Sequence, residues 1–171
     1  MAKLLFFAFC LFSMSAAGSA VSALEIKNLP EGWVFQKITP GSFEAGLTGA
    51  QGAISLKRGE EVLATILVFE KPLPKRESEG KSLSYWRRLV VPDANLSKRS
   101  IQYEGLLEPK SGGRYIVEYS TDTGTETQLQ SAVMAQKSGD SAVELRFENH
   151  RKVYKTYSQE ILKLFKEAAI E

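Results

Sequence analysis

Histidine occurs only once in the sequence, at His150, so any serine-hydrolase chemistry must use this residue. In such chemistry a histidine base takes the proton from a serine nucleophile, and Ser111 and Ser138 are the candidates. The chain lacks the Gly-x-Ser-x-Gly turn that positions many of these nucleophiles. Asn149 and His150 fall between the last predicted strand and the last predicted helix, where a polar capping role is common. We therefore expect a structural His150 and no catalytic residues, with a small hydrolase as the alternative.

Metal and phosphate sites have little support in the residue types. The only cysteine, Cys10, falls in the N-terminal apolar segment, so one histidine and scattered carboxylates remain as ligands. Glu60 and Glu61 are adjacent, and adjacent side chains on a strand point apart, which predicts a solvated hairpin tip. The glycine-rich residues 46–52 lack the Gly-Lys-Ser/Thr ending and the following helix of a phosphate loop, so we interpret them as a hairpin turn. No metal and no cofactor is predicted.

Three basic pairs lie in or around a predicted internal helix. Folding could gather them into one patch that faces an anionic surface, such as lipid headgroups or an acidic protein partner. The alternative is an ordinary solvated face, which is the usual role of a charge run. The candidate patch consists of Lys75, Arg76, Arg87, Arg88, Lys98 and Arg99.

Aromatic side chains form a second candidate site. Trp33, Tyr85 and Trp86 could line a cleft between the sheet and a helix and hold a small apolar ligand there. Aromatic residues at such positions more often belong to the core. The sequence leaves both interpretations open.

The elements that would position these residues begin with strands. Residues 33–35 follow a turn, and residues 42–47 and 53–57 are predicted as short strands. Residues 62–69 have the strongest strand pattern. They are apolar on both faces, which predicts a central strand that is covered on each side.

Helical spacing begins near Ser78 and ends at Pro92. Four alternating segments follow, separated by turn-like residues, as in an antiparallel meander. These segments are 101–107, 115–119, 129–135 and 143–147. An amphipathic helix over about residues 152–169 closes the chain, and its apolar stripe must pack against the sheet. The pattern predicts an α+β sandwich, with an antiparallel meander sheet of about seven strands flanked by two helices.

The first 23 residues have the pattern of a secretory signal peptide. Lys3 supplies the positive charge, an apolar run follows over residues 4–12, and Val21-Ser22-Ala23 matches a signal-peptidase site. The run is shorter than the ~20 residues that span a bilayer. We expect residues 24–171 to form a single domain that is exported to the periplasm or the extracellular space, with no transmembrane segment in the mature chain.

The charges are nearly balanced, with 22 Lys and Arg against 20 Asp and Glu. Such a balance produces no strong global positive field, so nucleic acid is not an expected partner. Apolar and aromatic residues are spread along the whole chain, unlike in a disordered protein.

Three segments resemble the PsbP-like fold family. They are Leu29–Trp33, Val143–Phe147 leading into Tyr154 and Tyr157, and Ile161–Lys166, in which Leu164 stands where a serine is common. The family includes extrinsic photosystem II subunits and many exported bacterial proteins. The resemblance implies an antiparallel sheet flanked by helices and members that act mostly by binding, and no family site residue can be transferred to this chain.

The expected function is a secreted or periplasmic, non-catalytic binding or assembly module of the cell envelope. Its partner would be another protein or an anionic envelope surface. The alternatives are a small secreted hydrolase that uses His150 and a carrier of a small apolar ligand.

Overall fold

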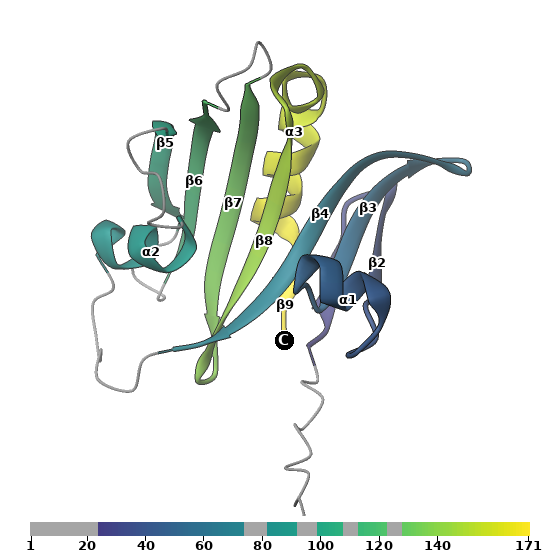
Figure 1. Cartoon of the computed structure of the whole chain (residues 1–171), viewed down its shortest axis with the longest axis horizontal. Helices are drawn as coiled ribbons and strands as arrows, with labels where there is room; N and C mark the ends of the chain where they lie inside the picture. The colour runs from purple at the N-terminus through teal and green to yellow at the C-terminus, as the bar shows by residue number, and fades with distance from the viewer. Residues whose placement is uncertain (1–23, 74–81, 92–98, 108–112, 123–127) are drawn as a thin grey trace, which may run out of the picture.

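The computed structural model describes residues 24–73, 82–91, 99–107, 113–122 and 128–171 (Figure 1). The predicted signal peptide lies outside these residues. The helices are α1 (Phe43–Thr48), α2 (Leu83–Val90) and α3 (Arg151–Glu167). The strands are β1 (Ile26–Lys27), β2 (Trp33–Lys37), β3 (Gly52–Arg58), β4 (Glu61–Pro72), β5 (Arg99–Leu107), β6 (Arg114–Thr121), β7 (Leu129–Ser138), β8 (Ser141–His150) and β9 (Ala169–Ile170).

Seven strands form one antiparallel sheet in the order β2-β3-β4-β8-β7-β6-β5. Strands β2–β4 form one meander and β5–β8 form another, and the pairing of β4 with β8 joins them. Gly139, in the tight turn between β7 and β8, has a φ of 55°, which glycine adopts without strain. The predicted α+β class and the antiparallel meander sheet are confirmed.

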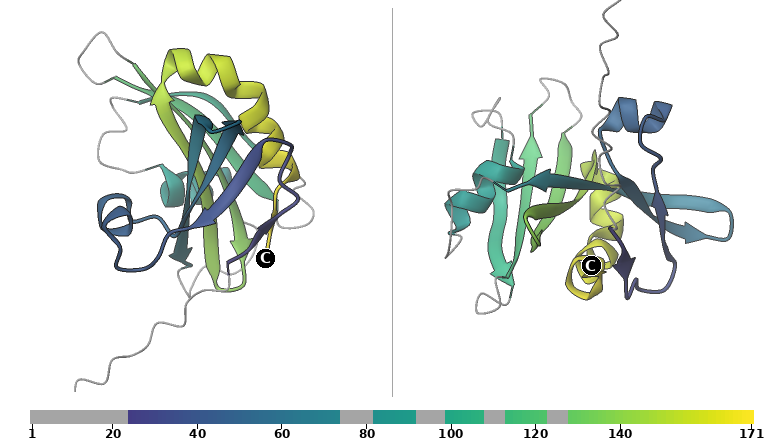
Figure 2. Two further views of the ribbon diagram at one scale, coloured as in Figure 1. Left: turned by 90° about the vertical axis from the view of Figure 1, so that its right-hand side faces the viewer. Right: turned by 90° about the horizontal axis from the view of Figure 1, so that it is seen from below.

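The helices lie on two sides of the sheet (Figure 2). Helix α3 covers one side and contacts β7 and β8, whereas α1 and α2 both lie on the other side. Helix α2 contacts β5, β6 and β7. None of the helices in the described part of the chain is long and apolar enough to cross a membrane.

The core on the α3 side follows from the alternation along the strands. In β8, Val143, Leu145 and Phe147 are buried against the apolar stripe of α3, which includes Ile161 and Phe165. The predicted closing helix is therefore confirmed, although it ends at Glu167 rather than near residue 169.

Both ends of the described chain meet just beyond the C-terminal end of this helix. Arg114 Nη1 donates to the carbonyl oxygens of Phe165 (3.0 Å) and Lys166 (2.8 Å), where the C-terminal end of a helix favours a positive charge. Beyond α3, β9 pairs with β1 in a separate two-stranded sheet, with Ile170 opposite Ile26.

Helix α2 confirms the internal helix that the sequence predicted from the helical spacing of its apolar residues. The hydroxyl of Ser82 accepts a hydrogen bond from the Tyr85 backbone N–H and caps the first turn. Tyr85, Trp86 and Val90 are buried against Tyr115, Val117 and Tyr119 of β6, in a second core on this side of the sheet. This helix begins at Leu83, because the capping Ser82 has an extended conformation, and not near residue 78, which lies outside the described residues.

Helix α1 corrects two predictions for residues 42–52. The segment predicted as a strand is a short helix, because Ser42 caps its first turn and Gly49 ends it with a φ of 67°. The predicted hairpin turn is also wrong, since residues 46–48 are helical and only residues 49–51 connect α1 to β3. No α1 residue is buried, so the sheet has a third flanking helix that contributes nothing to the core.

Candidate functional site on the open face of the sheet

One face of the sheet is covered only in part. The face that α1 and α2 share includes the outward side chains of β2, β3 and β4, and we call this surface the open face. It is defined by Val34, Ser55, Thr65, Leu67 and Phe69, which the strand register places on the same side. None of these side chains is buried, and Val34 and Thr65 are exposed.

Strand β4 shows the difference between the two faces. Ile66 and Val68 are fully buried on the α3 side, whereas Leu67 and Phe69 on the open face are only half-buried. The sequence predicted a strand that is covered on both faces, and this is wrong for the open face. The reason is that α2 packs over β5, β6 and β7 and leaves β4 largely uncovered.

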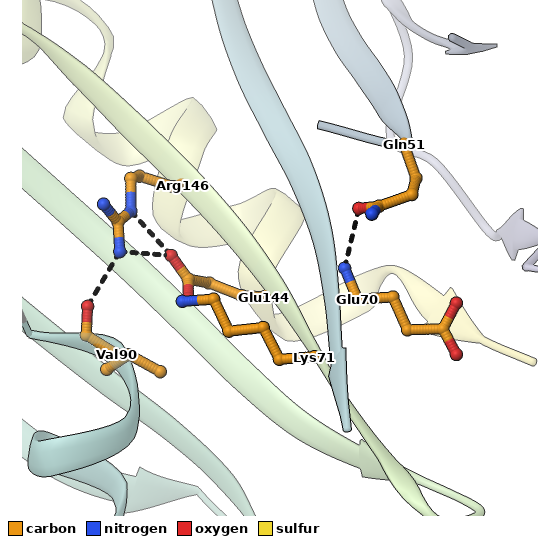
Figure 3. Close-up of polar contacts among 6 residues, drawn as sticks. All are labelled: Gln51, Glu70, Lys71, Val90, Glu144 and Arg146. Carbon is orange, nitrogen blue, oxygen red and sulfur yellow. Dashed lines mark hydrogen bonds and ion pairs between the residues drawn. The ribbon is translucent and has the colours of Figure 1, made fainter. Parts of the chain in front are cut away.

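A charge cluster lies where the open face meets α2 (Figure 3). It consists of Lys71 from β4 and of Glu144 and Arg146 from β8. The Glu144 side chain is 1% exposed; Lys71 Nζ lies 2.7 Å from its Oε2, and Arg146 Nη2 lies 2.5 Å from its Oε1. Arg146 Nη2 also donates to the carbonyl oxygen of Val90 at 2.8 Å. The cluster therefore joins the last turn of α2 to the sheet.

Phe69 lies beneath both cations of the cluster. Its ring centroid is 5.6 Å from the Arg146 guanidinium carbon and 6.0 Å from Lys71 Nζ. Cations over an aromatic face are attracted by the ring quadrupole. The ring thus helps to hold Lys71 and Arg146 in place next to the half-buried Leu67.

The second boundary of the open face is α1. Gln51, just after α1, accepts a hydrogen bond from the Glu70 backbone N–H through Oε1 at 2.8 Å, and its own N–H donates to the Val68 carbonyl at 2.8 Å (Figure 3). These bonds attach the α1 segment to β4. Phe43 and Leu47, one helical turn apart on α1, are 77% and 71% exposed.

The arrangement favours binding over proton transfer. Both carboxylate oxygens of Glu144 accept hydrogen bonds from cations, so this buried carboxylate is engaged within the protein and does not face a substrate. Within the described residues, no group of three His, Cys, Asp or Glu side chains is placed to hold a metal ion. The open face presents the half-buried apolar side chains Leu67 and Phe69 beside the two positive charges of Lys71 and Arg146.

Sequence reasoning missed all three members of the charge cluster. Lys71 lies 73 residues from Glu144, so no local pattern connects them. The one available signal is the Glu144–Arg146 spacing, because residues i and i+2 on a strand share a face.

A second polar network lies under α2. Arg87 forms an ion pair with Glu104 of β5, and Tyr115 of β6 donates its hydroxyl to Glu104 Oε1 at 2.7 Å. The hydrogen bonds from Arg87 and then from Tyr115 lower the pKa of the Glu104 carboxyl from its ordinary 4.5, although burial acts in the opposite direction. Burial, followed by the neighbouring Glu104, raises the pKa of the Tyr115 hydroxyl.

This network predicts a pH-dependent stability. Because the folded state lowers the pKa of Glu104, the contribution of this carboxylate is fully present above the ordinary pKa of about 4.5 and is lost as the pH falls below it. Glu104→Gln should lower the free energy of unfolding by about 1–2 kcal/mol at pH 7. In urea titrations from pH 7 to pH 2.5, the difference between E104Q and the wild type should shrink below pH 4.5. A difference that stays constant over this range would contradict the assignment.

The predicted basic patch is only partly described. Arg87 is neutralised by Glu104, and Arg99 is half-buried with its guanidinium carbon 5.3 Å from the Tyr119 ring centroid. Arg88, in the last turn of α2, is exposed. Lys75, Arg76 and Lys98 lie outside the described residues, so a patch of all six residues stays a prediction.

The structure does not bring the three predicted cleft aromatics together. Trp33 is buried in the core on the α3 side, whereas Tyr85 and Trp86 are buried in the core on the α2 side. Trp86 stacks on Tyr115 with ring centroids 6.3 Å apart. The sheet separates Trp33 from the other two, because its side chain points to the opposite face.

His150 lies at the junction between β8 and α3, as the sequence predicted. It occupies the N-cap position, but its side chain makes no capping hydrogen bond, and its backbone N–H donates to Asn149 Oδ1 at 2.7 Å. His150 pairs with Leu129, at the opposite end of the β7–β8 hairpin from Ser138. Ten-residue strands separate the two ends by about 30 Å, so Ser138 cannot serve as its nucleophile. Ser111 lies outside the described residues.

Comparisons with known proteins agree with this architecture. No family model and no curated protein matches the sequence. The solution structure of cyanobacterial PsbP from Synechocystis sp. PCC 6803 matches with a TM-score of 0.57 and 13% identity, over 92% of this chain and 98% of that one. LpqN, involved in cell envelope biogenesis of Mycobacterium tuberculosis, matches with a TM-score of 0.53 and 12% identity, over 86% of this chain and 84% of that one. The chain therefore has a PsbP-like fold.

Proposed function

We propose that this protein is an exported, non-catalytic binding module of the cell envelope and that the open face is its docking surface for a protein partner. The observation that carries the proposal is the pair of half-buried apolar side chains Leu67 and Phe69, whose neighbours on the other face of β4, Ile66 and Val68, are fully buried. Contiguous apolar surface that the fold leaves uncovered commonly marks an interaction site.

Helix α1 supports the same conclusion. Phe43 and Leu47 are large apolar side chains that contribute nothing to the core, so folding does not explain their presence. Helix α1, which carries them, lies on the same side of the sheet as the open face (Figure 2). A partner that contacted both would bury an apolar surface on two separate elements.

The envelope setting rests on two further lines. The pattern of the first 23 residues is that of a secretory signal peptide. The fold is also shared with LpqN, which is involved in cell envelope biogenesis in its own organism. Two observations support a binding role over hydrolysis. Both oxygens of the Glu144 carboxylate already accept hydrogen bonds from cations, and His150 and Ser138 lie far apart.

Site-specific photo-crosslinking in cells of the source organism tests this proposal. A benzophenone side chain is placed at Thr65 on the open face, at Phe43 on α1, and at the exposed Lys155 on α3 as the control on the opposite side. We expect irradiation to produce a discrete protein adduct from positions 65 and 43 but not from 155. A folded protein that gives no adduct from either test position would overturn the proposal.

A further inference from the structure

We propose that the open face recognises an acidic polypeptide segment, which places a carboxylate on Lys71 and Arg146 and an adjacent large apolar side chain on Leu67 and Phe69. This inference rests on the proposed docking function and adds the chemical class of the partner.

The charge cluster is only half neutralised. Lys71 and Arg146 carry two positive charges, and the buried Glu144 supplies one negative charge between them. Glu70 lies next to Lys71 in sequence, but it pairs with Val143, whose side chain faces α3, and so it projects to the other side of the sheet. Arg88, exposed in the last turn of α2, adds a further positive charge on the α2 side. Glu148, two residues from Arg146 on the same face of β8, is exposed and adds a second negative charge. The three cations Lys71, Arg146 and Arg88 still outnumber the two carboxylates, so the surface complements a negative partner.

Lys71 presents its charge to the surface of the molecule. Its side chain is 37% exposed, and an ammonium group has three donors, of which one is directed at Glu144. An incoming carboxylate can therefore bind Lys71 without displacing Glu144. A charge-assisted hydrogen bond of this kind is stronger than one between neutral groups.

Because the cations are partly buried, a ligand side chain can reach them more easily than a membrane surface can. The Arg146 side chain is only 19% exposed, because it lies between α2 and the sheet and donates to the Val90 carbonyl. A planar bilayer cannot enter between α2 and the sheet, so it would not reach Arg146. An extended segment or a helix carrying Asp or Glu can enter this space.

The apolar side chains of the open face determine which residue the ligand needs beside its carboxylate. Leu67 pairs with Arg146 across the β4–β8 ladder, and Phe69 lies two residues further along the same face. The apolar side chains Leu67 and Phe69 therefore lie directly beside the cations. A matching segment would contain an acidic residue within a few positions of Leu, Ile, Phe or Trp.

Selection from a phage-displayed library of random 12-residue peptides tests the inference, with the protein purified after expression of the full chain. We expect the enriched peptides to combine Asp or Glu with a nearby large apolar residue. Fluorescence anisotropy with one such peptide should show an affinity that falls as salt is raised. Lys71→Met should weaken binding at least about tenfold, as the loss of one hydrogen bond to a charged group implies.

Matched variants separate recognition from folding. Lys71→Arg keeps the positive charge and should retain most of the affinity, and Lys155→Met on the α3 side should have no effect. Leu67→Ser should also weaken binding, and thermal denaturation of each variant confirms that it is folded. Enriched peptides that are neutral or basic, or undiminished binding to folded K71M, would overturn the acidic assignment.

The test also separates this inference from the proposed function. If cells give the adduct at position 65 and that adduct persists undiminished in K71M, the docking surface stands and the acidic assignment fails. If vesicles of phosphatidylglycerol bind the protein while no acidic peptide does, the acidic assignment also fails, because the ligand is then a lipid surface.

Discussion

We expect Glu144→Gln to lower the free energy of unfolding by about 3 kcal/mol, as removal of one partner from a buried charge cluster implies. The substitution keeps the shape of the side chain but removes the negative charge that Lys71 and Arg146 both contact. Arg146 is mostly buried and holds the Val90 carbonyl, so water cannot fully replace the lost partner. Lys71 is more exposed and can turn toward water, which places the expected effect at the lower end of the range for buried ion pairs.

Urea denaturation followed by far-UV circular dichroism measures this effect. Glu148→Gln is the matched control, because Glu148 lies on the same strand and is exposed. Its one hydrogen bond, accepted from Ser131 Oγ at 3.0 Å, can also be accepted by the glutamine oxygen, so E148Q should change the stability by no more than about 0.5 kcal/mol. The double variant E144Q/R146M should be less destabilised than the sum of its single variants, since it leaves fewer charges unpaired. Equal stability of E144Q and E148Q would show that the cluster contributes little to the fold.

The helices and strands that bury one face in the core could be predicted from periodicity alone. The spacing of Leu83, Trp86 and Val90 identified α2, although Leu83 itself is exposed. The alternation of Val143, Leu145 and Phe147 identified β8. These patterns work because one face of each element is buried in a continuous core, and burial imposes the period of the helix or strand on the sequence.

Helix α1 escaped prediction because it has no buried face. Its short sequence lacks an apolar stripe with a core partner, and its two large apolar residues are exposed. The evidence for the helix was instead local, in the capping Ser42 and in Gly49, which adopts the left-handed conformation. Caps decide the structure of such a segment more than hydrophobic periodicity does.

The open face could not be predicted because it depends on where α2 packs. The apolar residues on both sides of β4 indicated cover on both faces, but α2 returns over β5, β6 and β7 instead. This packing of α2 brings the Val90 carbonyl to Arg146 and leaves Leu67 and Phe69 only half-buried. The candidate site is thus a product of the chain's path between β4 and β5, which no local pattern specifies.

Trp86 is the residue on which this path depends most. It is fully buried, stacks on Tyr115 with an interplanar angle of 12°, and meets Tyr85 edge to face with ring centroids 5.6 Å apart. We expect Trp86→Ala to lower the free energy of unfolding by about 3–5 kcal/mol, since it removes a large core side chain and leaves a cavity. Trp86→Phe keeps part of the ring contact and should be clearly less destabilising.

The region that loses hydrogen-exchange protection in W86A shows whether Trp86 anchors α2 or is a general core residue. An isolated helix of eight residues is not stable in water, so α2 without Trp86 should open more readily than the sheet. Hydrogen exchange of the native W86A protein should therefore show the largest loss of protection in α2, with smaller losses in β8 and α3. A uniform loss across all three elements would contradict this view. If α2 does open, the Arg146–Val90 contact is lost with it, and binding at the open face should weaken in W86A even where the sheet remains folded.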